Sequence, residues 1–140
     1  MAAVIIDAGP LYAMLDWREE HHSWTLQQLK LLRPPFLTCD AVLTEAFFLL
    51  ADENPRGGGQ LADYLRKNFI TPQFDSRKDI SRVLDLMKTY HDVPMSFADA
   101  CLVCMVEDHP GASIFTLDHD FSVYRQHRRR LIPLIAPFQR

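Results

Sequence analysis

The chain has 140 residues, of which 48% are hydrophobic and 24% charged, and its formal net charge is −3. These values are typical of a folded protein, and the length suits a single domain over residues 1–140. The acidic balance argues against a global basic field that recruits nucleic acid, although a local patch can still do so. No run approaches the roughly 20 apolar residues of a membrane-spanning helix. Three cysteines are an odd number for a disulfide framework, which suits a reducing compartment. From these two observations we expect a cytoplasmic protein with no membrane partner.

The first predicted element is a strand that ends in a carboxylate. Residues 2–6 form a short apolar run rich in Val and Ile, which suits a strand buried on both faces. Asp7 follows, and a charge at that point should emerge at the carboxyl edge of the strand, where open α/β sheets bind ligands. Gly9-Pro10 then breaks the strand, and a helix is expected from Leu11.

Helices and short strands alternate along the rest of the chain. Further helices are predicted at 21–32, 41–51, 61–69, 76–90 and 97–107. Further strands are predicted at 36–38, 70–72, 113–117 and 131–135. Residues 57–59 are expected to form a loop, and residues 118–130 a short polar helix or turn. This alternation predicts an α/β domain with a mainly parallel sheet.

Two predicted strands are followed by acidic residues. Asp118 and Asp120 come after the strand at 113–117, so they repeat the position of Asp7 at a second carboxyl end. A purely structural explanation stays open for each of them. Asp7 can simply end its strand, and Asp118 can cap the following helix.

Two predicted helices each carry one isolated carboxylate. Glu45 is the only charge in the nearly all-apolar helix at 41–51, which we expect to be buried on most sides. A lone buried carboxylate is costly unless a cation or several donors compensate it. Asp99 also lies among apolar residues, although Ser96-x-x-Asp99 fits a capping box. One convergent cluster is the more economical explanation of all these carboxylates.

A cluster of four carboxylates predicts bound cations, because like charges close together raise each other's pKa. Oxygen ligands without His or Cys suit Mg²⁺ or Mn²⁺. Such a site activates water and stabilises the charge that develops when a phosphodiester is cleaved. The residues therefore indicate a metal-dependent nuclease.

Four segments follow one another in a recognisable order. They are Asp7-Ala8-Gly9-Pro10-Leu11-Tyr12-Ala13, Thr44-Glu45, Ser96-x-x-Asp99-Ala100 and Thr116-Leu117-Asp118-His119-Asp120-Phe121. This order resembles the PIN-domain ribonucleases, especially the VapC-like toxins of bacterial toxin–antitoxin pairs, over essentially the whole chain. The resemblance implies a three-layer α/β/α domain with a central, mainly parallel sheet. Position 8 is Ala, where many members carry Ser or Thr.

The resemblance also implies an activity, a site and partners. The catalytic residues and the ligands of Mg²⁺ or Mn²⁺ would be Asp7, Glu45, Asp99 and Asp118, and Asp120 is a candidate fifth ligand. Thr116 and Ser96 would be polar support nearby. The implied activity is endonucleolytic cleavage of RNA, and the implied partners are an antitoxin protein that occludes the site and a second copy in a homodimer.

Two other functions stay open from the sequence. One is a catalytically inactive PIN-like domain that binds RNA or a partner protein; the complete acidic quartet argues against it. The other is an α/β phosphotransfer protein with Asp7 as phospho-acceptor. Proteins of that kind use a second Asp beside the nucleophile and a Lys near a later strand. Asp7-Ala8-Gly9 lacks the former, and nothing near Thr116 supplies the latter.

Two further patterns have simpler interpretations. Cys101-x-x-Cys104 lies inside a predicted helix and has no second cysteine pair, so we interpret both as buried free thiols. Arg125-x-His127-Arg128-Arg129-Arg130 is the one basic run. Its default interpretation is a solvated face, and it is also the natural candidate for contacts with RNA phosphates.

Overall fold

A computed structural model describes residues 2–139. At its centre is a five-stranded sheet in the order β3-β2-β1-β4-β7. Its strands are β1 (Val4–Ile6), β2 (Phe36–Thr38), β3 (Ile70–Pro72), β4 (Ser113–Phe115) and β7 (Leu134–Ile135). All of these strands pair in parallel. The predicted α/β class with a mainly parallel sheet is confirmed.

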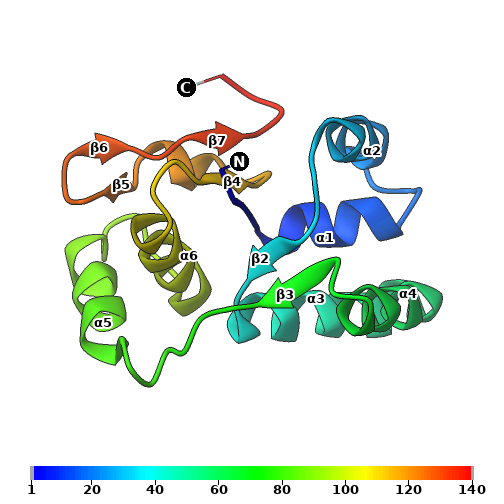
Figure 1. The fold of residues 1–140 in the computed structure, drawn as a ribbon, viewed down its shortest axis with the longest axis horizontal. Coiled ribbons are helices and arrows are strands. Elements are labelled where there is room, and N and C mark those ends of the chain that lie inside the picture. The colour runs from blue at the N-terminus through cyan, green and yellow to red at the C-terminus, as the bar shows by residue number, and fades with distance from the viewer. Residues whose placement is uncertain (1, 140) are drawn as a thin grey trace.

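Helices cover the sheet in two groups, which gives the three layers of an α/β/α fold (Figure 1). The helices are α1 (Ala8–Leu15), α2 (His22–Leu31), α3 (Asp40–Glu53), α4 (Pro55–Arg66), α5 (Ile80–Thr89) and α6 (Phe97–Asp108). The first four pack against one another, and α5 packs against α6. Within residues 2–139, none of the helices is long and apolar enough to cross a membrane.

The position of β1 explains why its end is a suitable place for a site. Strands β2 and β3 lie on one side of β1 and β4 and β7 on the other, so the order of the sheet reverses there. Ligands of open α/β sheets bind at such a reversal, beyond the carboxyl ends of the strands. The register pairs Ile6 with Phe115, and both are fully buried. The next residues, Asp7 and Thr116, therefore leave the sheet side by side.

Helix α6 is the most thoroughly buried helix. Residues 100–106 are each at most 1% exposed. A helix that is apolar all round is stable only where neighbours cover every face, and α6 lies against β1, β4, α3 and α5. Cys101 and Cys104 lie in this stretch and, like Cys39, are buried free thiols. The interpretation of both as small apolar side chains is confirmed.

Helix α3 differs from its prediction. Only Val42, Ala46 and Leu50 are buried, four residues apart along one stripe, while Phe48 is 74% exposed. Glu45 lies off that stripe and is exposed. The expectation that α3 is buried on most sides, and Glu45 with it, is therefore wrong. A run of apolar residues does not show how many faces its helix will cover.

Residues 57–59, expected to form a loop, are helical, and the segment predicted as a short polar helix or turn contains a turn and a hairpin. Residues 57–59 lie inside α4, where the Asn54 side chain accepts a hydrogen bond from Gly57 N and Pro55 occupies the first helical position. The cap and the proline favour the helix despite its glycines. The segment after β4 contains a 3₁₀ turn, η1 (His119–Ser122), and then an antiparallel hairpin of β5 (Arg125–Gln126) and β6 (Arg130–Leu131).

Candidate functional site

Asp7 is held rigidly at the end of β1. Its Oδ1 accepts a hydrogen bond from Ala8 N at 2.8 Å, and its Oδ2 accepts one from Thr116 Oγ1 at 2.7 Å. The side chain caps α1, and the residue is 9% exposed. Burial raises the pKa of Asp7 to about 7, although the two hydrogen bonds oppose the rise, and Asp99 and Glu45 add repulsion. Asp7 is thus a buried carboxyl group, and no Lys, Arg or His of residues 2–139 lines the cavity beside it.

Asp99 has both of the roles considered from the sequence. Ser96 Oγ accepts a hydrogen bond from Asp99 N at 3.0 Å, so Ser96 is the N-cap of α6. The Asp99 side chain also enters the site, where its Oδ2 accepts a hydrogen bond from Tyr124 Oη at 2.9 Å. Burial raises the pKa of Asp99, the bond from Tyr124 lowers it, and the charge of Asp118 raises it further.

Tyr124 is a residue that the sequence did not single out. It is fully buried and packs edge-to-face against Phe121 and Tyr90. A buried phenol needs a hydrogen-bond partner, and Asp99 supplies it. The contact joins residues 25 positions apart. No periodicity or motif indicates such a pair.

Asp118 and Asp120 shape the turn after β4. Asp118 N donates to Thr116 Oγ1 at 3.0 Å, and Asp118 Oδ1 accepts a hydrogen bond from Asp120 N at 2.8 Å. Asp118 therefore caps η1, as its structural explanation predicted, and its side chain is exposed at the edge of the sheet. Burial raises the pKa of Asp120, with a further contribution from the charge of Asp118.

All five acidic candidates line one cavity of about 460 Å³. They come from four elements: the end of β1, α3, α6 and the turn after β4. The five are Asp7, Glu45, Asp99, Asp118 and Asp120. The other lining residues are small, apolar or Ser96, and no Lys, Arg or His of the described chain lines this cavity. Glu45 lines the cavity because of its position on α3, where its side chain is exposed. The expected burial of Glu45 plays no part.

The chemistry of these donors fits a hard divalent cation. Every charged ligand is a carboxylate oxygen, which suits Mg²⁺ or Mn²⁺. Burial is the main cause of the raised pKa of Asp7, Asp99 and Glu45 add repulsion, and a bound cation would favour the charged form. However, no three His, Cys, Asp or Glu side chains within residues 2–139 stand close enough together for a ready-made metal site. The side chains line one cavity, and cation binding would have to draw them together.

The fold is that of a PIN-like α/β/α domain. Among solved structures, the chain is similar to VapC20 of Mycobacterium tuberculosis, described as a sarcin–ricin loop cleaving toxin. The TM-score is 0.77 over 86% of this chain and 94% of that one, with 16% sequence identity. Searches against protein-family models and curated proteins find no match. At this identity the likeness shows the fold, and it confirms the predicted PIN-like architecture.

Proposed function

We propose that this protein is a divalent-cation-dependent endoribonuclease that acts as the toxin of a toxin–antitoxin pair. The observation that carries the proposal is the cavity lined by five carboxylates, and by no cationic side chain of the described residues, at the carboxyl edge of the sheet. The similarity of the fold to a toxin that cleaves RNA supports the same conclusion. We propose RNA as the substrate and phosphodiester hydrolysis as the reaction.

In this proposal Asp7, Glu45, Asp99 and Asp118 hold Mg²⁺ or Mn²⁺, with Asp120 as a candidate fifth ligand. The bound cation would supply Lewis acidity and an activated water for hydrolysis. The protein's own contribution is to hold the ligands in place. Thr116 Oγ1 and Ala8 N fix the carboxylate of Asp7, and Tyr124 Oη fixes that of Asp99.

The proposal extends to partners and location. An antitoxin protein would cover the acidic cavity, and a second copy of the chain would complete a homodimer. Exposed apolar side chains on α3 support a protein contact, because Phe48 is 74% exposed and Leu49 36% exposed. An RNA-cleaving toxin of this kind is expected to act in the cytoplasm.

The test is cleavage of total RNA by the purified protein. We expect cleavage with Mg²⁺ or Mn²⁺, none with a chelator, and none with Asp7→Asn. Cleavage that survives Asp7→Asn or Asp99→Asn would contradict the site. If no RNA is cut with Mn²⁺ present, the inactive binding domain becomes the better description. A covalent phosphate on Asp7 would instead support the phosphotransfer protein.

A further inference from the structure

The acidic cavity by itself cannot hold a strand of RNA. An RNA strand carries one negative charge per nucleotide, and proteins bind it mainly by neutralising phosphates with Lys and Arg. Five carboxylates line the cavity, and the described residues bring no cationic side chain to its wall. Phosphates beside the one being cleaved must therefore be held elsewhere.

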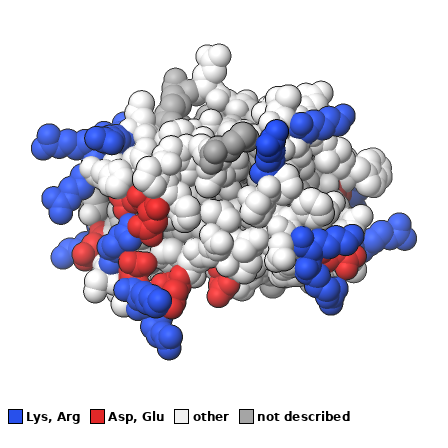
Figure 2. Space-filling view, in the orientation of Figure 1, with Lys and Arg blue, Asp and Glu red and all other residues white. Residues whose placement is uncertain are grey.

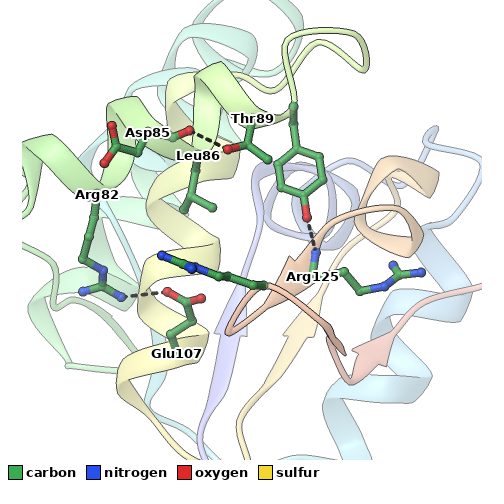
Figure 3. A pocket seen from close by; sticks show the side chains of 8 residues that line it. Arg82, Asp85, Leu86, Thr89, Glu107 and Arg125 are labelled. Carbon is green, nitrogen blue, oxygen red and sulfur yellow. Dashed lines mark hydrogen bonds and ion pairs between the residues drawn. The ribbon is translucent and has the colours of Figure 1, made fainter.

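A second cavity, of about 470 Å³, lies between α5, α6 and the β5–β6 hairpin (Figure 3). Its charged lining residues are Arg82, Asp85, Glu107, Arg125 and Arg128. Figure 2 shows Lys and Arg side chains gathered mainly at two ends of the molecule, one of which is the end with α5 and the hairpin. We propose that this second cavity binds a phosphate of the RNA backbone. The inference rests on the proposed function and names the part of the protein that holds the substrate.

Two of the charged residues are occupied in building the cavity. Arg82 donates to Glu107 Oε1 at 2.9 Å, as Figure 3 shows, and also to Asp79 at 3.2 Å and Asp108 at 3.1 Å. The other oxygen of Glu107 accepts a hydrogen bond from His127 N at 2.6 Å. Glu107 thus ties the turn of the hairpin to α6, and its charge is compensated by Arg82.

In the described part of the chain, one arginine of this cavity, Arg128, remains with its donors free for a ligand. Arg125 uses Nη1 to bind the carbonyl oxygens of Ser122, Val123 and Tyr124. This anchors its guanidinium on the preceding turn, and in Figure 3 the side chain points away from Arg82 and Glu107. The Arg128 side chain is exposed and makes no hydrogen bond or ion pair within residues 2–139. Its backbone, with a φ of 71°, lies in the turn that Glu107 holds, so the point from which the side chain extends is fixed.

A short aromatic connection joins this cavity to the acidic one. Tyr90 Oη accepts a hydrogen bond from Arg125 N at 3.0 Å, and the ring of Tyr90 packs on Tyr124 at 5.2 Å. Tyr124 Oη in turn binds Asp99. Asp120 and Arg125 are five residues apart, which is at most about 18 Å of chain. In this proposal both cavities lie on the path of one RNA strand, and this short separation supports it.

The test measures binding of a short single-stranded RNA by fluorescence anisotropy, with a chelator present so that no cleavage occurs. We expect Arg128→Gln to weaken binding about tenfold, as for the loss of one charge-assisted hydrogen bond. The slope of log affinity against log salt should fall by about 0.7. Arg129→Gln removes the same charge from the same turn, outside the cavity, and should cost less. Asp85→Asn removes an exposed carboxylate from the cavity wall and should tighten binding.

Equal losses in Arg128→Gln and Arg129→Gln, or no effect of Asp85→Asn, would overturn the phosphate site. Unchanged affinity in Arg128→Gln would also overturn it and would leave the cavity to an acidic peptide. These results are separate from those for the proposed function. If the protein and its variants bind RNA as expected but the protein never cuts RNA, the phosphate site is supported and the proposed endoribonuclease activity is contradicted. If the protein cuts RNA but all three variants bind RNA as tightly as the natural protein, the endoribonuclease activity is supported and the phosphate site is contradicted.

Discussion

Thr116 Oγ1 donates a hydrogen bond of 2.7 Å to Asp7 Oδ2 and so joins the carboxyl ends of β4 and β1, which are 109 residues apart in sequence. The same hydroxyl oxygen accepts a hydrogen bond from Asp118 N at 3.0 Å. One fully buried side chain thus sets the positions of two proposed metal ligands. Asp7 and Asp118 are therefore fixed relative to the carboxyl ends of β1 and β4.

Thr116→Val should therefore damage both stability and activity. It leaves Asp7 Oδ2 and Asp118 N without their partner, and such a loss costs about 1–3 kcal/mol of unfolding free energy. RNA cleavage should fall at least tenfold. Chemical denaturation and a cleavage assay measure the two effects. Thr116→Ser keeps the hydroxyl and is the control; if Val and Ser behave alike, the hydrogen bond does not matter.

The raised pKa of Asp7 makes the metal-free protein lose stability as pH rises. The pKa of Asp7 is about 7 in the folded protein against an ordinary value of 3.8, so between these values the folded state holds a proton that the unfolded state has released. The unfolding free energy should then fall by up to about 1.4 kcal/mol per pH unit across that window. Denaturation in a chelator at pH 5 and pH 8 should show this fall.

Asp7→Asn isolates this effect, because Asp99 and Asp120 also have raised pKa values and act in the same direction. The variant cannot ionise at position 7, so its unfolding free energy should depend less on pH than that of the natural protein. At pH 8 without cations it should be the more stable of the two. The same pH dependence in both proteins would show that Asp7 ionises normally.

Tyr124→Phe should weaken the site while leaving the fold intact. The substitution removes only the hydroxyl that binds Asp99, whose other surroundings stay in place. Because that bond favours the charged carboxylate, its loss should raise the cation concentration needed for half-maximal cleavage by about tenfold. Tyr64→Phe, on α4, is the matched control. It should change neither the unfolding free energy nor the cation concentration needed for half-maximal cleavage. Normal cation dependence in Tyr124→Phe would remove Tyr124 from the site.

Glu45→Gln separates cation binding from stability. Because Glu45 is exposed, its replacement should change the unfolding free energy of the metal-free protein by less than about 0.5 kcal/mol. The stabilisation that Mn²⁺ confers on the natural protein, about 2.7 kcal/mol at one hundred times the dissociation constant, should be reduced. Thermal unfolding with and without Mn²⁺ measures this. A variant as strongly stabilised by Mn²⁺ as the natural protein would exclude Glu45 as a ligand.

The sequence was informative wherever a local pattern controls the structure. A buried parallel strand needs a continuous apolar run, and a carboxylate directly after it can only leave the core at the strand's end. That reasoning placed Asp7 correctly at the end of β1; β4 ends at Phe115, two residues earlier than predicted, so Asp118 lies in the turn beyond it. The N-cap at Ser96 followed equally from local chemistry, because a serine hydroxyl can satisfy a free amide of the first helical turn.

The sequence by itself thus determined the α/β class, the parallel sheet and the acidic residues at two strand ends. Only the tertiary structure decided that Glu45 is exposed at the rim of a cavity, since burial of α3 depends on which neighbours cover it. The same holds for the basic run, which forms a hairpin whose turn is bound to Glu107 of α6 through His127 N. Tyr124 and Asp99 likewise meet only through the tertiary fold, since they are 25 residues apart in sequence. These contacts join distant segments, and local periodicity carries no record of which segments will meet.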